Sequence, residues 1–294
     1  MTATDIKRLA LEAGFDLAGI SPAALAPRHA EALGRWIADG FAGTMGYMVR
    51  DGADRAKPER RLEGARSVIS LAVNYYHPDD PKPKQGMGRI AKYAYGRDYH
   101  RIIEKMLKRL IRAIRAMEPA ARLKGYVDTG PVLEKAFAQS AGLGFFGKNT
   151  NLITREYGSY VFLASLLTDL ELAADEPHAG SCGSCRLCID ACPTGALLGD
   201  HRIDARRCIA YLTIESKEDP PPELESRMGE WAFGCDVCQE VCPYNFRAKL
   251  TRHEEIYPKK IAGTWVELER IGRARFPGSP VNRARRFKVR EEVV

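Results

Sequence analysis

The eight cysteines of this 294-residue chain carry the clearest chemical signal in its sequence. All of them lie between Cys182 and Cys242, and no cysteine precedes Cys182. A secreted protein that depends on disulfides would spread its cysteines through the fold, whereas the cytosol keeps thiols reduced. Cysteines clustered in this way indicate a metal centre.

The first cysteine motif has the spacing of bacterial ferredoxins. It reads Cys182-x2-Cys185-x2-Cys188-x3-Cys192-Pro193, with the proline included. Two residues between cysteines let a turning backbone direct successive sulfurs at adjacent irons of one cluster. The fourth cysteine, three residues later and followed by proline, points toward a second cluster.

The second motif has one cysteine fewer and is completed by a residue that stands alone. It reads Cys235-x2-Cys238-x3-Cys242-Pro243, with Cys208 upstream. Together the motifs provide eight thiolates, which suffice for two [4Fe-4S] clusters. Two structural zinc sites are the alternative, but zinc uses paired C-x2-C units that are usually well separated. Closely spaced cysteines that end twice in Cys-Pro favour clusters.

The crossing of the fourth cysteines predicts two sets of ligands, one for each cluster. In each set, the last cysteine of one motif joins three cysteines that lie outside that motif. The first cysteine set consists of Cys182, Cys185, Cys188 and Cys242. The second cysteine set consists of Cys192, Cys208, Cys235 and Cys238.

The elements that must position these cysteines follow from hydrophobic periodicity. Helices are expected at residues 4–14, 28–39, 100–117 and 131–141, the last with a proline in its first turn. Strands are expected at residues 67–76, 125–128 and 160–168, with a loop at residues 77–88. Strands that alternate with helices predict an α/β domain in the N-terminal half.

The helix expected at residues 100–117 has a basic outer face. Its apolar residues recur at helical spacing, and the opposite face carries Lys105, Lys108, Arg109 and Arg112. Such a face is compatible with solvent exposure and with contact to phosphate groups.

Asp128 is a candidate acid at the end of the strand expected at residues 125–128. A carboxyl group in this position could donate a proton if burial raises its pKa. Its position is equally compatible with a helix cap.

Composition sets limits on where the protein works and what it binds. The sequence has no run of 18 or more apolar residues and no basic-then-apolar leader, so we expect a cytoplasmic protein without a membrane span. A net charge of +7 is compatible with a nucleic-acid partner but does not require one.

The ordered motifs of the chain resemble those of the epoxyqueuosine reductases, cobalamin- and iron–sulfur-dependent enzymes that complete queuosine synthesis in tRNA. The resemblance extends over nearly the whole chain and includes both cysteine motifs. The other matching segments are residues 43–48 (GTMGYM), 64–70 (GARSVIS), 96–100 (GRDYH), 127–134 (VDTGPVLE), 141–150 (AGLGFFGKNT), 158–160 (GSY) and 208–213 (CIAYLT).

The resemblance implies a fold and a reaction. It implies a nitroreductase-like, cobalamin-binding α/β (α+β) domain at residues 1–174 and a ferredoxin-like double [4Fe-4S] domain at residues 175–250. A basic extension would follow at residues 251–294. Cobalamin, reduced through the clusters to cob(I)alamin, would drive removal of the epoxide oxygen from tRNA. A flavodoxin- or ferredoxin-type donor would supply electrons to a monomeric enzyme.

The resemblance also assigns roles to single residues. Asp128 matches the proposed proton donor, and Arg55 matches a cobalamin contact. Asn149 and Leu152 fall where the cofactor is lined. Asp98-x-His100 matches the beginning of a signature that places a histidine under cobalt in other cobalamin proteins. The resembling family binds cobalamin without a histidine ligand, so we interpret His100 as structural or close to the RNA.

Two other functions share features of this sequence. A reductive dehalogenase also combines cobalamin with two clusters, but such enzymes usually carry an export signal. A ferredoxin-type electron carrier would need only the cysteine region, and some 175 residues precede it here. Binding of cobalamin would separate both enzymes from a carrier.

The C-terminal segment is a candidate RNA-binding surface. Many members of the resembling family continue into a helical-repeat domain, which we expect to be absent here. Between residues 270 and 290 the chain carries basic residues and no acidic one: Arg270, Arg273, Arg275, Arg283, Arg285, Arg286, Lys288 and Arg290. A solvated tail and a phosphate-binding segment both fit this pattern.

Overall fold

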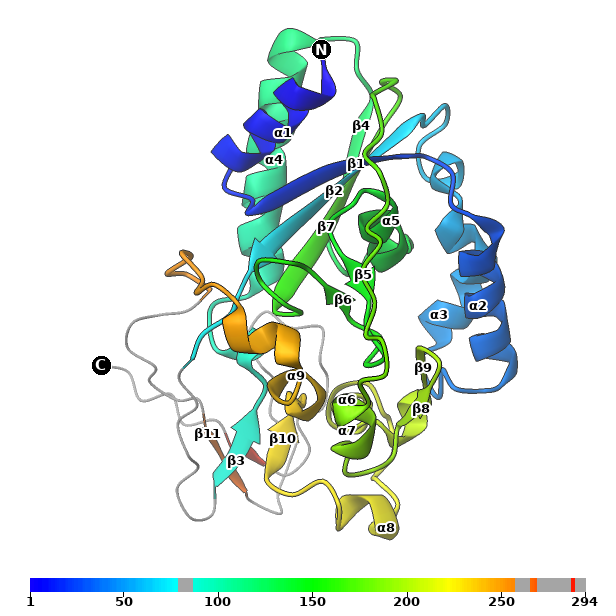
Figure 1. Ribbon diagram of the computed structural model, residues 1–294, viewed down its shortest axis with the longest axis vertical. Coiled ribbons are helices and arrows are strands. Elements are labelled where there is room, and N and C mark those ends of the chain that lie inside the picture. The colour runs from blue at the N-terminus through cyan, green and yellow to red at the C-terminus, as the bar shows by residue number, and fades with distance from the viewer. Residues whose placement is uncertain (79–86, 257–264, 269–286, 289–294) are drawn as a thin grey trace.

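The structure is a computed structural model that describes residues 1–78, 87–256, 265–268 and 287–288. Its centre is a four-stranded sheet in the order β1-β2-β7-β4, in which every neighbouring pair is antiparallel (Figure 1). The strands are β1 (Leu17–Pro22), β2 (Ser67–Asn74), β4 (Leu123–Tyr126) and β7 (Val161–Thr168). The strands expected from residues 67 and 160 onward are therefore confirmed. The strand expected at residues 125–128 forms as β4 but ends at Tyr126, so Asp128 lies in the loop after it.

Helices cover both faces of this sheet, as Figure 1 shows. Ile69, Leu71 and Val73 of β2 pack on the face covered by α1 (Ala3–Glu12) and α4 (Tyr99–Met117). Their neighbours in β2 pack on the opposite face, where α5 (Glu134–Ser140) lies. Because successive side chains of a strand point to opposite faces, a strand covered twice must be apolar throughout. All eight residues of β2 are buried.

Three of the four expected helices form close to their predicted bounds, including α2 (Pro27–Ala38). The fourth was expected from residue 131 but α5 begins at Glu134. Residues before it form a turn, in which Val132 N donates to Gly130 O at 2.8 Å and Leu133 N donates to Arg55 O at 3.0 Å. The proline thus lies in the turn and not in the first turn of the helix.

The cysteine region consists of short elements that pack on the N-terminal half. A second sheet has the order β10-β3-β11-β12 and pairs strands from distant parts of the chain. Its strands are β3 (Met87–Ile90), β10 (Trp231–Phe233), β11 (Trp265–Leu268) and β12 (Phe287–Lys288). The remaining elements of the region are α6 (Leu187–Asp190), α7 (Ile209–Ile214), α8 (Pro222–Glu225), α9 (Val237–Glu240), β8 (Leu197–Gly199) and β9 (Arg202–Ile203).

A shared hydrophobic cluster joins the two halves. Ile209 and Leu212 of α7 pack with Trp231 and with Ala91, and Trp36 of α2 contacts the same cluster. The sequence-based boundary between residues 174 and 175 therefore crosses a continuous core.

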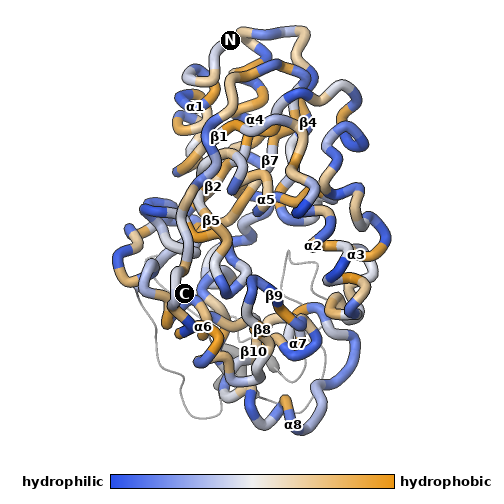
Figure 2. The backbone as a smooth tube through the Cα atoms, turned by 45° about the vertical axis from the view of Figure 1, so that its right-hand side comes forward, coloured by the Kyte–Doolittle hydropathy of each residue, from blue (hydrophilic) through white to orange (hydrophobic). Residues whose placement is uncertain are grey.

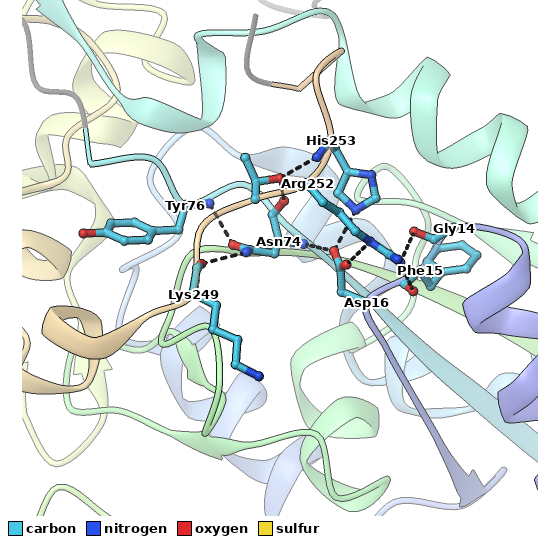
Figure 3. A network of polar contacts seen from close by, with 9 residues as sticks. Gly14, Phe15, Asp16, Asn74, Tyr76, Lys249, Arg252 and His253 are labelled. Carbon is cyan, nitrogen blue, oxygen red and sulfur yellow. Dashed lines mark hydrogen bonds and ion pairs between the residues drawn. The ribbon is translucent and has the colours of Figure 1, made fainter. Parts of the chain in front are cut away.

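The segment after the second cysteine motif returns to the edge of the central sheet (Figure 3). Arg252 Nε donates to Asp16 Oδ1 at 2.8 Å, and His253 Nε2 lies 2.8 Å from Asp16 Oδ2. Asn74 N donates to Asp16 Oδ2 at 2.7 Å, and Asn74 Nδ2 donates to Lys249 O at 2.9 Å. We call these five residues the Asp16 network.

Hydrophobic residues concentrate along the central strands, for example β7 in Figure 2. Among the described residues, no helix combines the length and apolar character that crossing a membrane requires. Part of the loop expected at residues 77–88 lies outside the described residues, as do nearly all of the basic residues between 270 and 290.

Candidate functional site

The first cysteine set lines a single cavity of about 290 Å³. Its four cysteines share this cavity with Leu187 and Tyr244, which are 49% and 42% exposed. Burial raises the pKa of Cys188, and the neighbouring thiols of the same set raise it further. Cys242, from the second motif, therefore lies with the three leading cysteines of the first motif.

The main chain and side chain of Lys148 fix the loop that carries the first set. Lys148 N donates to Cys182 Sγ at 3.4 Å. Lys148 Nζ donates to Gly183 O at 2.7 Å and to Cys185 O at 2.9 Å. This lysine therefore places a cation and an N–H group beside the first set, and both favour negative charge there.

The second cysteine set lies beside the hydrophobic cluster that joins the two halves, where Cys208 and Cys235 are partly buried. Burial raises the pKa of Cys238 well above its ordinary value, and the nearby Cys235, Cys208 and Cys192 thiols raise it further. Cys192 thus lies with the second set. Asn149 Nδ2 donates to Cys238 O at 3.3 Å, so adjacent residues of one loop contact both sets.

Asp128 lies at the centre of a group of polar side chains that face one another. Tyr99 Oη donates to Asp128 Oδ2 at 2.8 Å, and His100 Nε2 lies 3.2 Å from the same oxygen. His100 Nδ1 lies 2.8 Å from Asp98 Oδ1, so both ring nitrogens of the histidine have partners within the chain. Tyr99 is held by stacking on Phe162, with ring centroids 4.1 Å apart.

The expectation that burial raises the pKa of Asp128 is wrong for this arrangement. Burial does act in that direction, but hydrogen bonds from His100 and Tyr99 outweigh it and lower the pKa of Asp128. The pKa of His100 is raised, chiefly by its hydrogen bond to Asp128 and against the effect of burial. Both shifts favour an Asp128 carboxylate beside a protonated imidazole, and the Asp128 side chain is 58% exposed.

The backbone around Asp128 is strained, and Arg55 supports it. Asp128 has φ of 53°, a left-handed conformation that costs energy for a residue with a Cβ. The buried Arg55 donates from Nη1 to Gly130 O at 3.3 Å and from Nη2 to Tyr47 O at 3.1 Å. Its Nε has no partner among the described residues. Arg55 thus holds the loop that presents the Asp128 carboxylate.

Glu134 and Lys135, at the start of α5, link Asp128 to the second cysteine set. Asp128 N donates to Glu134 Oε1 at 3.3 Å. Burial raises the pKa of Glu134 well above its ordinary value, and the Asp128 carboxylate adds to this. Burial lowers the pKa of Lys135, while Cys238, Asp128 and Glu134 act in the opposite direction. These groups are surrounded by protein yet remain accessible, which indicates space beside them.

Comparison with known proteins decides the family. A family model described as epoxyqueuosine reductase QueG, DUF1730, matches residues 55–129, and one described as a 4Fe-4S double cluster binding domain matches residues 181–245. An epoxyqueuosine reductase from Leadbetterella byssophila is 43% identical over 91% of this chain and 87% of its own length. The chain belongs to the epoxyqueuosine reductase family. A second relative, from Gloeobacter violaceus, is 46% identical over 91% of this chain and 84% of its own length.

Solved structures of the family share this fold. The crystal structure of an epoxyqueuosine reductase with an epoxyqueuosine-modified tRNA-Tyr stem loop matches with a TM-score of 0.79 and 32% identity. The enzyme from Bacillus subtilis matches with a TM-score of 0.80 and 32% identity. Each match covers 87% of this chain and 68% of the other. The mixed α/β fold and the double-cluster region are therefore those of the epoxyqueuosine reductases.

Two residues expected from the family resemblance lie in different surroundings. Asn149 is buried and fixes the second set through Cys238. Leu152, expected to line the cofactor, is 2% exposed and packs with Ala138 and Leu143 in the core. Its side chain is therefore covered by protein, and its place at the cofactor stays a prediction.

Sequence reasoning missed several members of this epoxyqueuosine reductase site. Tyr99, Glu134 and Lys135 received no role, and His100 was interpreted as structural or close to RNA. Tyr99 and His100 belong to the GRDYH segment, and Glu134 ends the VDTGPVLE segment. Both segments contributed to the family resemblance. Polar residues at the ends of these matching segments were therefore the signal that could have identified Tyr99, His100 and Glu134.

Proposed function

We propose that this protein reduces epoxyqueuosine to queuosine in tRNA, the last step of queuosine biosynthesis. The observation that carries this proposal is the accessible Asp128 carboxylate, paired with His100 on one side and joined through Tyr99 and Tyr93 to the hydrophobic cluster that contains Cys208 and Cys235. The reaction removes the epoxide oxygen as water and leaves a carbon–carbon double bond. It consumes two electrons and two protons, so it needs an electron source and a proton source in one place.

The two cysteine sets would hold the electron carriers. We assign one [4Fe-4S] cluster to the first set and one to the second, with Cys242 and Cys192 as the crossing ligands. The cavity that the first set lines and the mutual proximity of the second-set thiols support this assignment. Residues 175–250 would then form the ferredoxin-like part of the enzyme.

We also propose that residues 1–174 form a nitroreductase-like, cobalamin-binding domain. Cobalamin would supply a strongly reducing metal centre for opening the epoxide. The exposed Asp128 carboxylate and the Nε of Arg55, which has no partner among the described residues, are polar groups that a large cofactor could contact. Arg55 and Asp128 would contact or support it, and Asn149 would join it to the cluster region. Both ring nitrogens of His100 are engaged, which supports binding without a histidine ligand.

Proton delivery would start at His100. The raised pKa of His100 keeps its imidazole protonated, and Nε2 lies 3.2 Å from Asp128 Oδ2. Asp128 would pass this proton to the oxygen released from the epoxide, and Asp98 would hold the imidazole in place through Nδ1. The carboxylate remains the group nearest the substrate, as the family resemblance implies, but His100 stores the proton.

The partners of this reaction follow from its chemistry. The substrate would be tRNA that carries epoxyqueuosine, bound in part through the basic residues between 270 and 290. A flavodoxin- or ferredoxin-type protein would supply the electrons. We propose a monomeric, cytoplasmic enzyme.

Anaerobic reconstitution tests the proposal directly. The purified protein would be loaded with iron, sulfide and cobalamin, reduced with dithionite, and incubated with epoxyqueuosine-containing tRNA. Conversion of the nucleoside to queuosine, measured by mass spectrometry after digestion, is the expected result. A protein that binds both clusters but retains no cobalamin would instead be an electron carrier.

A further inference from the structure

The first cysteine set lies at an outward-facing part of the molecule. The segment from Ser181 to Leu187 contains four fully exposed residues besides its two half-buried cysteines: Ser181, Gly183, Ser184 and Arg186. Leu187 itself lines the cavity of the set and is 49% exposed. A cluster held there would lie a short distance from any protein bound at this face.

Large apolar side chains gather around this cavity. Leu187 and Tyr244 line it from opposite motifs. Phe246 is 69% exposed and lies in the 3-10 helix Pro243–Arg247, three residues after the cavity-lining Pro243, a spacing that puts both residues on one side of the helix. Single exposed apolar residues are ordinary on protein surfaces. Their grouping around a redox centre indicates a surface that is covered during function.

The charges at this face are mostly positive. Arg186 is exposed, and the exposed Arg247 lies three residues after the cavity-lining Tyr244, on the same side of the 3-10 helix Pro243–Arg247. Lys148 places its ammonium group beside the loop of the first set. Asp190 is the acidic neighbour, 3.6 Å from Arg186. A positive rim around an apolar centre attracts a partner with the opposite charge and accelerates its association.

The second cysteine set is closer to the reacting groups. Tyr93 packs in one hydrophobic cluster with Cys208 and Cys235, and its ring centroid lies 6.4 Å from that of Tyr99, which donates to Asp128. The first set instead packs with Phe145 and Ile153 and has the exposed Leu187 and Tyr244 at its cavity. Electrons that arrive from outside would therefore reach the first set before the second. The outward face beside the first set would then be the surface that an electron donor contacts.

We propose that Leu187, Tyr244 and Phe246, with Arg186 and Arg247 at their rim, form the docking surface for a small acidic protein that transfers one electron at a time. We call this the entry surface, and the inference rests on the function proposed above. Each encounter oxidises the carrier by one electron and reduces the first cluster by one. Two encounters supply the electron pair that one epoxide consumes. Small redox encounters bury little area, which suits a compact patch of this kind.

The test uses the holoenzyme with both clusters and a reduced acidic flavodoxin as the probe. Anaerobic stopped-flow absorbance would follow cluster reduction in wild type and in the double variant Arg186→Gln/Arg247→Gln. At low salt, the second-order rate constant of the variant should fall about tenfold, because steering by charge is lost. The two proteins should converge at high salt, where screening removes the steering from both.

Matched controls separate docking from other effects. Arg112→Gln/Arg115→Gln removes the same charge from the exposed face of α4 and should leave the flavodoxin rate unchanged. Phe246→Ser should slow reduction by flavodoxin at every salt concentration, because it removes apolar contact. Dithionite is a small reductant that needs no docking surface, so it should reduce all of these proteins at the wild-type rate.

The outcomes distinguish this inference from the proposed function. Equal flavodoxin rates and equal salt dependence in wild type and the Arg186/Arg247 variant would overturn the entry surface. So would failure of the acidic flavodoxin to reduce wild-type clusters that dithionite does reduce. Neither result affects epoxyqueuosine reduction driven by dithionite. Loss of that dithionite-driven reaction in wild type would instead overturn the proposed function.

Discussion

The two cysteine sets arise from similar motifs, yet their neighbours differ. The first set faces outward, beside exposed apolar side chains and the Lys148 ammonium group. Both sets contact the N-terminal half. The first packs with Phe145 and Ile153, whereas the second packs with Tyr93, whose ring centroid lies 6.4 Å from that of Tyr99 beside Asp128. Cysteine spacing can determine which thiols meet, but the N-terminal half determines which set is near the reacting groups. We therefore propose that the first set receives electrons and the second delivers them.

The largest effect is expected from breaking the second set. Cys192→Ser should remove the cluster held with Cys208, Cys235 and Cys238, leave about half the iron, and abolish turnover. Iron analysis and electron paramagnetic resonance would show which cluster is lost. Cys188→Ser is the matched variant and should remove the other cluster. If Cys192→Ser removed the first cluster instead, the crossed assignment would be wrong.

The second-largest effect is expected at the Asp128 carboxylate. Asp128→Asn keeps the shape of the side chain but removes the carboxylate that passes the proton. Turnover driven by dithionite should fall on the order of 100-fold or more, the usual range for a lost acid–base group, while both clusters keep their spectra. Asp190→Asn removes a carboxylate near the first set and should retain wild-type turnover. Wild-type turnover in Asp128→Asn would exclude a role in proton transfer.

The fold was more predictable from sequence than the site. Regular periodicity predicted α4, and mostly apolar runs predicted β2 and β7, because helix and strand burial depend on local pattern. The start of α5 was misplaced, because the turn before Glu134 depends on a contact with Arg55, which is distant in sequence. The pKa of Asp128 was unpredictable for the same reason, since His100 and Tyr99 reach it only in the folded chain.

A smaller effect should separate proton storage from proton transfer. His100→Gln can still form a hydrogen bond to Asp128 but cannot hold an additional proton. We expect turnover at neutral pH to fall about tenfold, less than for loss of the group nearest the substrate. Because the pKa of His100 is raised, wild-type turnover should decline as pH rises through a value above its usual value of about 6.5. The variant should lack this decline. A variant with the wild-type pH profile would assign the proton to another group.

The environment of the first set can be altered without touching its ligands. Lys148→Gln removes a positive charge that favours the reduced, more negative cluster. The reduction potential of the first cluster should become more negative, while that of the second stays close to its wild-type value. Redox titration monitored by electron paramagnetic resonance measures both. Lys124→Gln is a suitable control, because Lys124 also donates to a backbone carbonyl but lies on the central sheet. Equal shifts of both clusters would show that Lys148 does not distinguish them.

The smallest effect on turnover is expected at the Asp16 network, which lies apart from both sets of ligands. Hydrogen bonds from His253 and Asn74 outweigh burial and lower the pKa of Asp16, so its charged form stabilises the folded protein. This stabilisation is present above the unfolded-state pKa of about 3.9 and is lost as pH falls through the lower folded-state value. Asp16→Asn should therefore cost about 2 kcal/mol at neutral pH and lower the melting temperature by several degrees, because it weakens hydrogen bonds to a charged group. Glu156→Gln breaks the exposed ion pair with Lys249 and should cost less than about 1 kcal/mol.

Both variants should keep wild-type cluster spectra and turnover at temperatures where they remain folded. Altered cluster spectra in Asp16→Asn would show that this edge of the sheet positions the cysteines as well as stabilising the fold.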